Sequence, residues 1–369
     1  MQRNNRRNND GRGGFGRGDK GAGRADSVRA KKALGQHFLK SQDIARVIAR
    51  CVHPQYVPRL MPDGSLDRLA AGALTHDASE FRPKDEASSG MPPLAAGMEL
   101  PAAGKSGFSG DVPLPDTCRM TYSGLSASSA LALPGKPIHV LEIGPGMGVL
   151  SVCLWEDPML DVKLVELDPE SVVYLASHYP DKTRDGKLIP ADFLKMDLRE
   201  VFCGESFVLT GNFPYNISSQ ILFRVLEYKE LVPVMGGMFQ KEVGERVCAR
   251  PGSKAYGIMS VLLQAFYRTE YLFTVEAEEF LPPPKVRSCV IRLSRNDSSA
   301  LGCDEKLFVY LVKKAFNQRR KTLRNAFKGI EEEKGLSTRD FPAAMLEKRA
   351  EQLGVEDYVA LVNLLRADR

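Results

Sequence analysis

The 369-residue sequence has few cysteines, none of them in a CxxC pair, and it has no long apolar run. Seven scattered cysteines, an odd number, argue against a zinc ribbon and a disulfide framework and are typical of a reducing cytoplasm. No apolar segment approaches the roughly 20 residues that a membrane-spanning helix needs. The first ten residues, MQRNNRRNND, lack the apolar core of a secretory signal. We therefore expect a cytoplasmic protein without membrane contact.

Apolar residues make up 43% of the chain, which is enough for a folded core, and the net charge of +5 is mildly basic. Two regions depart from this average. Residues 1–30 are rich in Arg, Gly and Asn and too poor in apolar residues to fold, so we predict a disordered basic tail. Residues 55–136 are rich in Pro, Gly, Ala and Ser without periodicity, and we predict a disordered insertion there.

Hydrophobic periodicity predicts a helix at 41–52 and, after the insertion, strands that alternate with helices such as 218–227. The predicted strands are 138–144, 162–168, 187–193, 207–213, 234–240, 271–280 and 288–294. This alternation predicts an α/β domain at 137–298, with a parallel sheet covered by helices on both faces. We assign residues 31–54, which include the helix at 41–52, to the same domain. From residue 299 onward helical patterning dominates, which indicates a small all-helical C-terminal domain.

Polar residues and glycines follow the first predicted strand, where open α/β sheets bind ligands. Gly144 and Gly146 would let a ligand approach the backbone closely. Glu142, two positions earlier, would repel the pyrophosphate of a dinucleotide but suits a ligand that carries positive charge. S-adenosylmethionine carries an ammonium and a sulfonium and no phosphate, so this pattern favours a methyl donor over a dinucleotide.

Carboxylates close the next two predicted strands. Glu166 can accept both ribose hydroxyls of an adenosine, and Asp168 is the alternative for this role. Asp192 can accept a hydrogen bond from the adenine amino group. A solvated strand end for Glu166 and a turn-initiating residue for Asp192 are the purely structural interpretations.

The segment LTGNFPYNISSQ at 209–220 follows the fourth strand and suggests a clamp for an exocyclic amine. The lone pair of adenine N6 is delocalised into the ring, which makes the amine a poor nucleophile. The Asn212 side-chain carbonyl and the main-chain carbonyl of Phe213 or Pro214 could accept its two N–H groups and stabilise the developing charge. Pro214 restricts the backbone, and Tyr215 offers a ring on which a flipped base can stack. Ordinary turn chemistry is the alternative.

Nine motifs occur together in a characteristic order: KKALGQHFL (31–39), LEIGPGMGVLS, VELD, ADF, GNFPYNIS, QKEVGERV (240–247), SKAYGIMSV (253–261), FLPPPKVRS (280–288) and FNQRRKTLRN (316–325). Over roughly 30–54 and 137–369 the sequence resembles the small-subunit ribosomal RNA adenine dimethyltransferases, the RsmA/KsgA family. The resemblance implies a Rossmann-like methyltransferase domain with a mostly parallel seven-stranded sheet. It also implies formation of N6,N6-dimethyladenosine, with S-adenosylmethionine as methyl donor, at two adjacent adenosines near the 3′ end of 16S rRNA.

The resemblance also implies roles for individual residues. It suggests that His37 and Leu39 line the donor pocket with Gly144, Gly146, Glu166, Asp192 and Asn212. The family usually has Asn where His37 stands. Phe280 resembles the aromatic residue that forms the second face of the adenine sandwich, and the alternative is a core Phe before a polyproline turn. No metal is implied.

Two basic clusters are candidates for RNA contact: Lys241, Arg246, Arg250 and Lys254, and Arg319, Arg320, Lys321 and Arg324. A charge run is usually a solvated face, but beside a methyltransferase with an RNA substrate we expect phosphate contacts. Two rival functions are a resistance methyltransferase acting on large-subunit RNA and a non-catalytic assembly factor. The motif FNQRRKTLRN argues against the resistance methyltransferase, and the intact clamp argues against the non-catalytic assembly factor. We therefore expect a monomer that acts on the small ribosomal subunit during its biogenesis.

Overall fold

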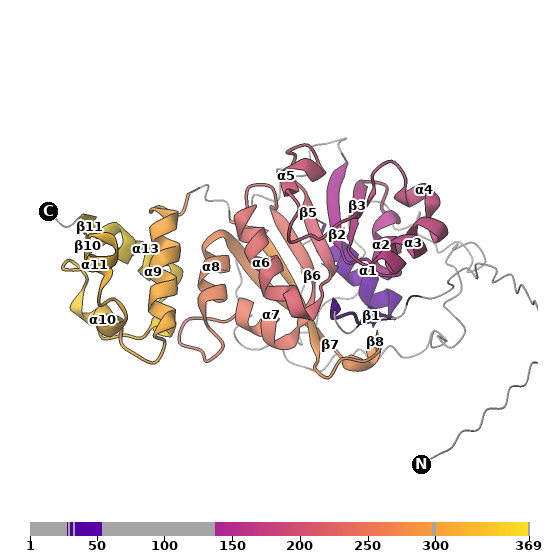
Figure 1. Cartoon of the computed structure of the whole chain (residues 1–369). Helices are drawn as coiled ribbons and strands as arrows, with labels where there is room; N and C mark the ends of the chain where they lie inside the picture. The colour runs from indigo at the N-terminus through magenta and orange to yellow at the C-terminus, as the bar shows by residue number, and fades with distance from the viewer. Residues whose placement is uncertain (1–27, 29, 32–33, 54–136, 297–299, 368–369) are drawn as a thin grey trace, which may run out of the picture.

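The structure is a computed structural model that describes residues 28, 30–31, 34–53, 137–296 and 300–367 (Figure 1). Most of the predicted tail at 1–30 and the predicted insertion at 55–136 lie outside the described residues. A central sheet carries helices on both sides, and the C-terminal helices gather at one end of the molecule (Figure 1).

The sheet has seven strands in the order β4-β3-β2-β5-β6-β9-β7. The strands are β2 (Ile138–Ile143), β3 (Leu160–Glu166), β4 (Leu188–Pro190), β5 (Val208–Asn212), β6 (Val234–Gln240), β7 (Tyr267–Val275) and β9 (Ser288–Arg295). All pairings from β4 to β6 are parallel, and β9 runs antiparallel to both β6 and β7. The alternating pattern predicted a parallel sheet, and the structure confirms it for the strands from β4 to β6. The mostly parallel seven-stranded sheet that the resemblance implied is also confirmed.

Two predicted strands differ from the structure by more than two residues at one or both ends. The strand expected at 187–193 ends at Pro190, and Asp192 then accepts the Leu194 N–H at 3.0 Å and starts a turn. The strand expected at 271–280 is divided: β7 begins at Tyr267 and ends at Val275, and the 3-10 helix η6 (Ala277–Glu279) follows. A separate strand, β8 (Phe280–Leu281), pairs with β1 (Phe38–Leu39). The periodicity could not separate β8 from β7, because the partner of β8 lies more than 200 residues away.

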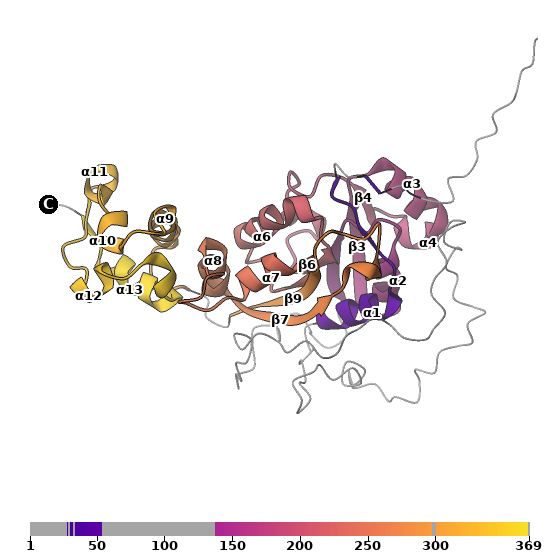
Figure 2. The ribbon, with the colours of Figure 1, turned by 90° about the horizontal axis from the view of Figure 1, so that it is seen from below.

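Helices cover both faces of the sheet (Figure 2). The helices of this part of the chain are α1 (Gln42–Cys51), α2 (Val149–Trp155), α3 (Pro169–His178), α4 (Pro180–Thr183), α5 (Leu198–Val201), α6 (Ser218–Glu227), α7 (Lys241–Val247) and α8 (Ile258–Phe266). On one face Ile48 of α1 and Leu154 of α2 pack on Val140. On the other face Ile221 of α6 lies in the core with Leu141. Adjacent strand residues thus point to opposite cores, as the two-residue repeat of a strand requires.

The helix predicted at 41–52 forms α1, and its cap explains its beginning. The Ser41 hydroxyl accepts the Ile44 N–H at 3.3 Å, and Ile44, Ile48 and Cys51 are buried on one side. The side chains recur at the spacing of an amphipathic helix, so the buried stripe fixes α1 against the sheet.

The C-terminal part is largely helical, as predicted. Its helices are α9 (Glu305–Asn317), α10 (Leu323–Ala326), α11 (Ile330–Lys334), α12 (Ala343–Leu346), η7 (Ala350–Gln352) and α13 (Val355–Leu364). The sequence prediction of an all-helical domain missed one short antiparallel pair, β10 (Leu336–Ser337) with β11 (Arg366–Ala367). Phe308 of α9 and Tyr358 of α13 share a core with Val261 and Leu262 of α8. Within the described residues, no helix is both long enough and apolar enough to span a membrane.

Candidate active site

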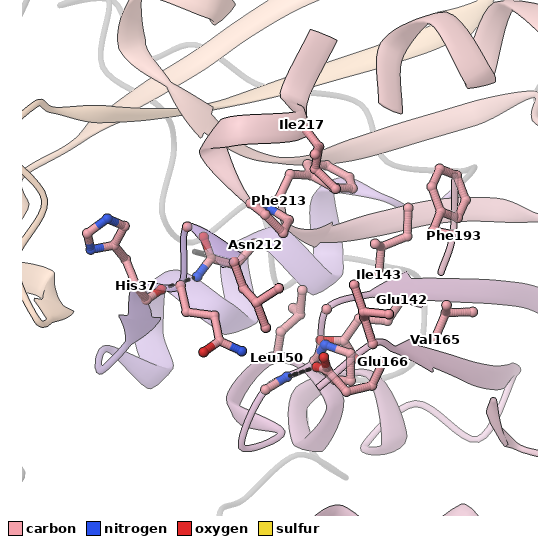
Figure 3. Close-up of a pocket in the computed structure, with 18 of the residues that line it drawn as sticks. His37, Glu142, Ile143, Leu150, Val165, Glu166, Phe193, Asn212, Phe213 and Ile217 are labelled. Carbon is pink, nitrogen blue, oxygen red and sulfur yellow. Dashed lines mark hydrogen bonds between the residues drawn. The ribbon is translucent and has the colours of Figure 1, made fainter. Parts of the chain in front are cut away.

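A cavity of about 200 Å³ lies at the carboxyl ends of β2, β3 and β5, and residues 34–39 close one side of it (Figure 3). Its wall includes every residue that we predicted for the methyl donor: His37, Leu39, Gly144, Gly146, Glu166, Asp192 and Asn212. Parallel strands end at the same edge of a sheet, which explains why residues far apart in sequence meet here. Their roles toward a ligand stay predictions.

Glycines shape the loop after β2. Gly144 and Gly146 have φ angles of 64° and 58°, in the left-handed region that side chains rarely adopt. A Cβ at Gly146 would also lie 2.9 Å from the Phe38 ring. Backbone conformation and space therefore both require glycine at this position.

The Glu166 carboxylate at the end of β3 is preorganised by the main chain. It is 5% exposed and accepts the Gly146 N–H at 3.0 Å and the Asp168 N–H at 2.8 Å, one on each oxygen (Figure 3). Burial raises its pKa, and the two main-chain donors oppose this increase. Each oxygen keeps a further acceptor position, so two hydroxyl groups of a ligand can bind side by side.

Asp168, the alternative candidate for binding the ribose hydroxyls, is already bound by other residues of the chain. Its side chain is fully buried and binds the Lys31 ammonium at 2.5 Å and the Gln36 amide at 3.3 Å. It also accepts the Glu170 N–H at 3.2 Å and so caps α3. Asp168 therefore anchors the N-terminal segment beside the cavity, and Glu166 is the better candidate for ligand binding.

Glu142 differs from the expectation based on its charge. It is 1% exposed and binds the Ser151 hydroxyl at 2.6 Å, and burial raises its pKa to about 8. Burial therefore favours the protonated form of this carboxyl group. This weakens the argument that a negative charge at Glu142 repels phosphate, although Glu142 does line the cavity.

The raised pKa of Glu142 predicts how stability depends on pH. Between about pH 4.5 and 8 the folded state keeps a proton that the unfolded chain releases, so the free energy of unfolding falls as pH rises through this window. Glu142→Gln has no such proton. We expect the difference in unfolding free energy between wild type and variant to change by roughly 2–4 kcal/mol between about pH 5 and 8 in urea denaturation. Glu170→Gln, at an exposed position, should follow the wild type; parallel curves for Glu142→Gln would contradict the protonated state.

The clamp at the end of β5 is held from two sides. The Asn212 Nδ2 donates to the His37 main-chain oxygen at 2.8 Å (Figure 3), which leaves the Asn212 Oδ1 to accept from a ligand. The Phe213 side chain is buried and packs on Phe239. The Pro214 carbonyl accepts the Ile217 N–H at 3.3 Å, at the end of the 3-10 helix η5 (Tyr215–Ile217). Of the two main-chain acceptors that the sequence left open, the Phe213 carbonyl is therefore the better candidate.

Two aromatic rings were predicted to hold a base, and the structure places one of them at the cavity and the other in the core. Tyr215 lines the cavity, its hydroxyl binds the Ser288 hydroxyl, and His37 stacks on its ring with a centroid distance of 5.2 Å. Phe280 is 1% exposed and lies in the core, because pairing of β8 with β1 sets it opposite Leu39. The core interpretation of Phe280 thus matches this structure, and stacking on a base would require its side chain to leave the core.

Sequence reasoning missed the apolar part of the cavity wall. Leu167 is 53% exposed between Glu166 and Asp168, and Phe193 follows Asp192. The available signal for Leu167 in the sequence was a large apolar residue between two carboxylates at the end of a predicted strand. In the part of the chain that the structure describes, no three His, Cys, Asp or Glu side chains gather as a metal site would require.

The two basic clusters predicted for RNA meet where the C-terminal helices contact the loop between α7 and α8. Arg319 donates to the Lys254 main-chain oxygen at 2.7 Å and to the Glu351 carboxylate at 2.9 Å. Lys254, Arg320 and Lys321 are exposed beside this junction. The clusters therefore meet at the contact between Arg319 and Lys254, and we call the exposed cations beside it, Lys254, Arg320 and Lys321, the basic surface at the domain junction.

Other members of these clusters are partly neutralised. Arg324 pairs with Glu347 at 2.7 Å and Arg246 with Glu242 at 2.7 Å, and Lys241 pairs with Glu245. Arg250 is half-buried. The structure adds Lys348 and Arg349, which sequence reasoning missed, because the Leu323 N–H donates to the Lys348 oxygen and Thr322 bridges to Arg349.

Comparisons with known proteins show what the chain is similar to. A family model described as ribosomal RNA adenine dimethylase matches residues 128–367. A protein of Bacteroides thetaiotaomicron named ribosomal RNA small subunit methyltransferase A is 57% identical over 226 residues, which cover 61% of this chain and 82% of the relative. A protein of the same name from Flavobacterium johnsoniae is 52% identical over 65% of this chain and 89% of its own length. The crystal structure of a dimethyladenosine transferase from Plasmodium falciparum has a TM-score of 0.50 and 26% identity, and the match covers 60% of this chain and 88% of that chain.

Proposed function

The chain belongs to the ribosomal RNA adenine dimethylase family, and from this premise we propose that it dimethylates N6 of two adjacent adenosines near the 3′ end of 16S rRNA. The observation that carries the proposal is the Asn212 amide at the carboxyl end of β5, whose nitrogen is bound by the His37 carbonyl. Its oxygen is thereby left to accept a hydrogen bond from an exocyclic amine. We further propose that the protein acts as a cytoplasmic monomer in small-subunit biogenesis.

S-adenosylmethionine fits the residues of the cavity and would supply an electrophilic methyl group on its sulfonium. Glu166 would accept the two ribose hydroxyls, since each of its oxygens is held by one main-chain N–H and has room for a second donor. Asp192 would accept from the adenine amino group, and Leu167 and Phe193 offer apolar surface for the adenine ring. The left-handed backbone at Gly144 would admit the methionine part of the donor.

The clamp residues would activate the target amine. The Asn212 Oδ1 and the Phe213 carbonyl accept its two N–H groups, which favours a pyramidal nitrogen and stabilises the positive charge that develops as the methyl group arrives. The buried Phe213 ring and the restricted backbone of Pro214 hold these acceptors in place. The proton leaves after the transfer, so no general base has to act first.

The choice of the small subunit rests on the names of the relatives at 52–57% identity. It can be tested with radiolabelled S-adenosylmethionine and purified ribosomal particles. We expect label in immature small subunits that lack the modification, and none in large subunits. Label in large subunits alone would support a resistance-type enzyme. Particles that bind without taking up label would indicate a binding factor.

The basic surface at the domain junction provides a test of RNA binding. Replacing Arg320 and Lys321 with Ala removes two exposed charges and should lower the affinity for small-subunit RNA about 10-fold. The slope of log K against log salt concentration should decrease by about 1.4–1.8, which corresponds to two lost phosphate contacts. Lys182→Ala/Arg184→Ala is the matched control, because these exposed cations lie at and just after α4, at the opposite end of the molecule (Figure 1). Equal salt slopes for the two double variants would contradict the proposed surface.

A further inference from the structure

Residues 34–39 pass along the cavity, and the pairing of β1 with β8 fixes which way their main-chain groups point. The Lys40 N–H donates to the Glu279 oxygen at 2.8 Å, and the next pairs along the ladder are Leu39 with Phe280 and Phe38 with Leu281. Hydrogen-bonded pairs alternate in an antiparallel ladder, so the main-chain groups of His37 face away from β8. There the His37 carbonyl accepts the Asn212 Nδ2 at 2.8 Å.

This contact selects one of two orientations of the Asn212 amide. With the nitrogen on the His37 carbonyl, the oxygen is the atom available to the target amine. In the reverse orientation two oxygens would face each other at His37, and the amide N–H groups would point at the N–H groups of the target. The position of the His37 carbonyl therefore decides whether Asn212 presents an acceptor.

The His37 side chain makes a second contact that holds the His37 main-chain carbonyl in position. Its Nδ1 lies 2.9 Å from the Pro282 main-chain oxygen, which can only accept, so Nδ1 carries the proton. The imidazole also stacks on Tyr215 of the clamp at 5.2 Å. One side chain thus joins the N-terminal segment, the loop after β8 and the clamp.

We propose that His37 is a positioning residue for Asn212, acting through the hydrogen bond from its Nδ1 to the Pro282 carbonyl. The inference rests on the proposed function and deepens it. The proposal can be tested by substitution. Asn Nδ2 lies as many covalent bonds from Cα as His Nδ1, so Asn at position 37 can make the same hydrogen bond to the Pro282 carbonyl. Gln places its amide nitrogen one bond further out, and Phe keeps a stacking ring without a donor.

The test compares His37→Asn, His37→Gln and His37→Phe in the full chain. The first readout needs no activity: the side-chain amide NMR signals of Asn212, assigned by their loss in Asn212→Ala. We expect these signals to keep their positions and slow hydrogen exchange in His37→Asn, and to shift and exchange faster in His37→Gln and His37→Phe. His178→Gln is the matched control, because the His178 Nδ1 also lies 2.9 Å from a carbonyl, that of Tyr174, and its ring stacks on Tyr174.

The second readout separates positioning from cofactor binding. We expect His37→Asn to keep kcat within about 3-fold of wild type, and His37→Gln and His37→Phe to lose about 10²-fold in kcat. Because His37 lines the cavity, we expect their Kd for S-adenosylhomocysteine to rise, but by a much smaller factor than kcat falls. Unchanged Asn212 signals in both Gln and Phe variants, or a loss of affinity without a loss of kcat, would overturn the inference. If the wild type transfers no methyl group, the proposed function fails, while the NMR signals still decide on His37.

Discussion

Asn212→Ala should lower kcat of methyl transfer by about 10³-fold, because it removes the side-chain oxygen that accepts from the target amine. The amine is a poor nucleophile until its lone pair is released from the ring, and the Phe213 carbonyl alone accepts only one of its two N–H groups. The affinity for small-subunit RNA should stay within about 2-fold of wild type, since we propose that the RNA phosphates bind the basic surface at the domain junction. Single-turnover assays and filter binding measure the two quantities.

Asn363→Ala is the matched control for this prediction. It removes the same amide from the helical domain, where Asn363 donates to the Gly302 carbonyl at 3.1 Å. Its kcat should equal that of the wild type. Asn212→Asp offers a sharper test: the carboxylate can accept but cannot donate to the His37 carbonyl, so we expect activity well below wild type. Methyl transfer by Asn212→Ala at more than a tenth of the wild-type rate would show that the clamp does not activate the amine.

Glu166→Gln should raise the Kd for S-adenosylmethionine about 10²-fold, with a smaller effect on kcat at saturating donor. Hydrogen bonds to a charged acceptor contribute about 1.5–3 kcal/mol each, and the neutral amide offers one acceptor atom where the carboxylate offers two. The amide nitrogen would also face a main-chain N–H of Gly146 or Asp168. Isothermal titration with the donor measures the effect directly.

Glu170→Gln, in the first turn of α3 and exposed, is the control and should bind the donor like the wild type. Thermal unfolding of the proteins without ligand separates a binding defect from a loosened glycine loop. If Glu166→Gln binds the donor as tightly as the wild type, Glu166 does not hold the ribose, and the assignment of the cavity would have to be revised.

Local signals in the sequence predicted most of the fold. The apolar spacing of Ile44, Ile48 and Cys51 gave α1, and short apolar runs ending in Glu166 and Asn212 gave the strands that carry the site. Because parallel strands end at one edge, the meeting of these residues followed from their order alone. The bounds of β4 and β7 were less accurate, since turns at Asp192 and at 277–279 interrupt the apolar pattern.

The features that the sequence did not predict depend on contacts between residues far apart in sequence. The pairing of Phe38–Leu39 with Phe280–Leu281 turns Phe280 into the core, and no local pattern reports it. Burial raises the pKa of Glu142 to about 8, whereas its sequence position suggested a charged carboxylate. The basic clusters looked separate until the contact between Arg319 and Lys254 joined them.

The most direct test of the account is the identity of the product. RNA from small subunits incubated with the protein and S-adenosylmethionine is digested to nucleosides and to fragments, and both are analysed by mass spectrometry. We predict N6,N6-dimethyladenosine at two adjacent adenosines near the 3′ end of 16S rRNA with wild-type protein, and about 10³-fold less of it in the same time with Asn212→Ala. A different methylated nucleoside, or a comparable yield from Asn212→Ala, would contradict the account.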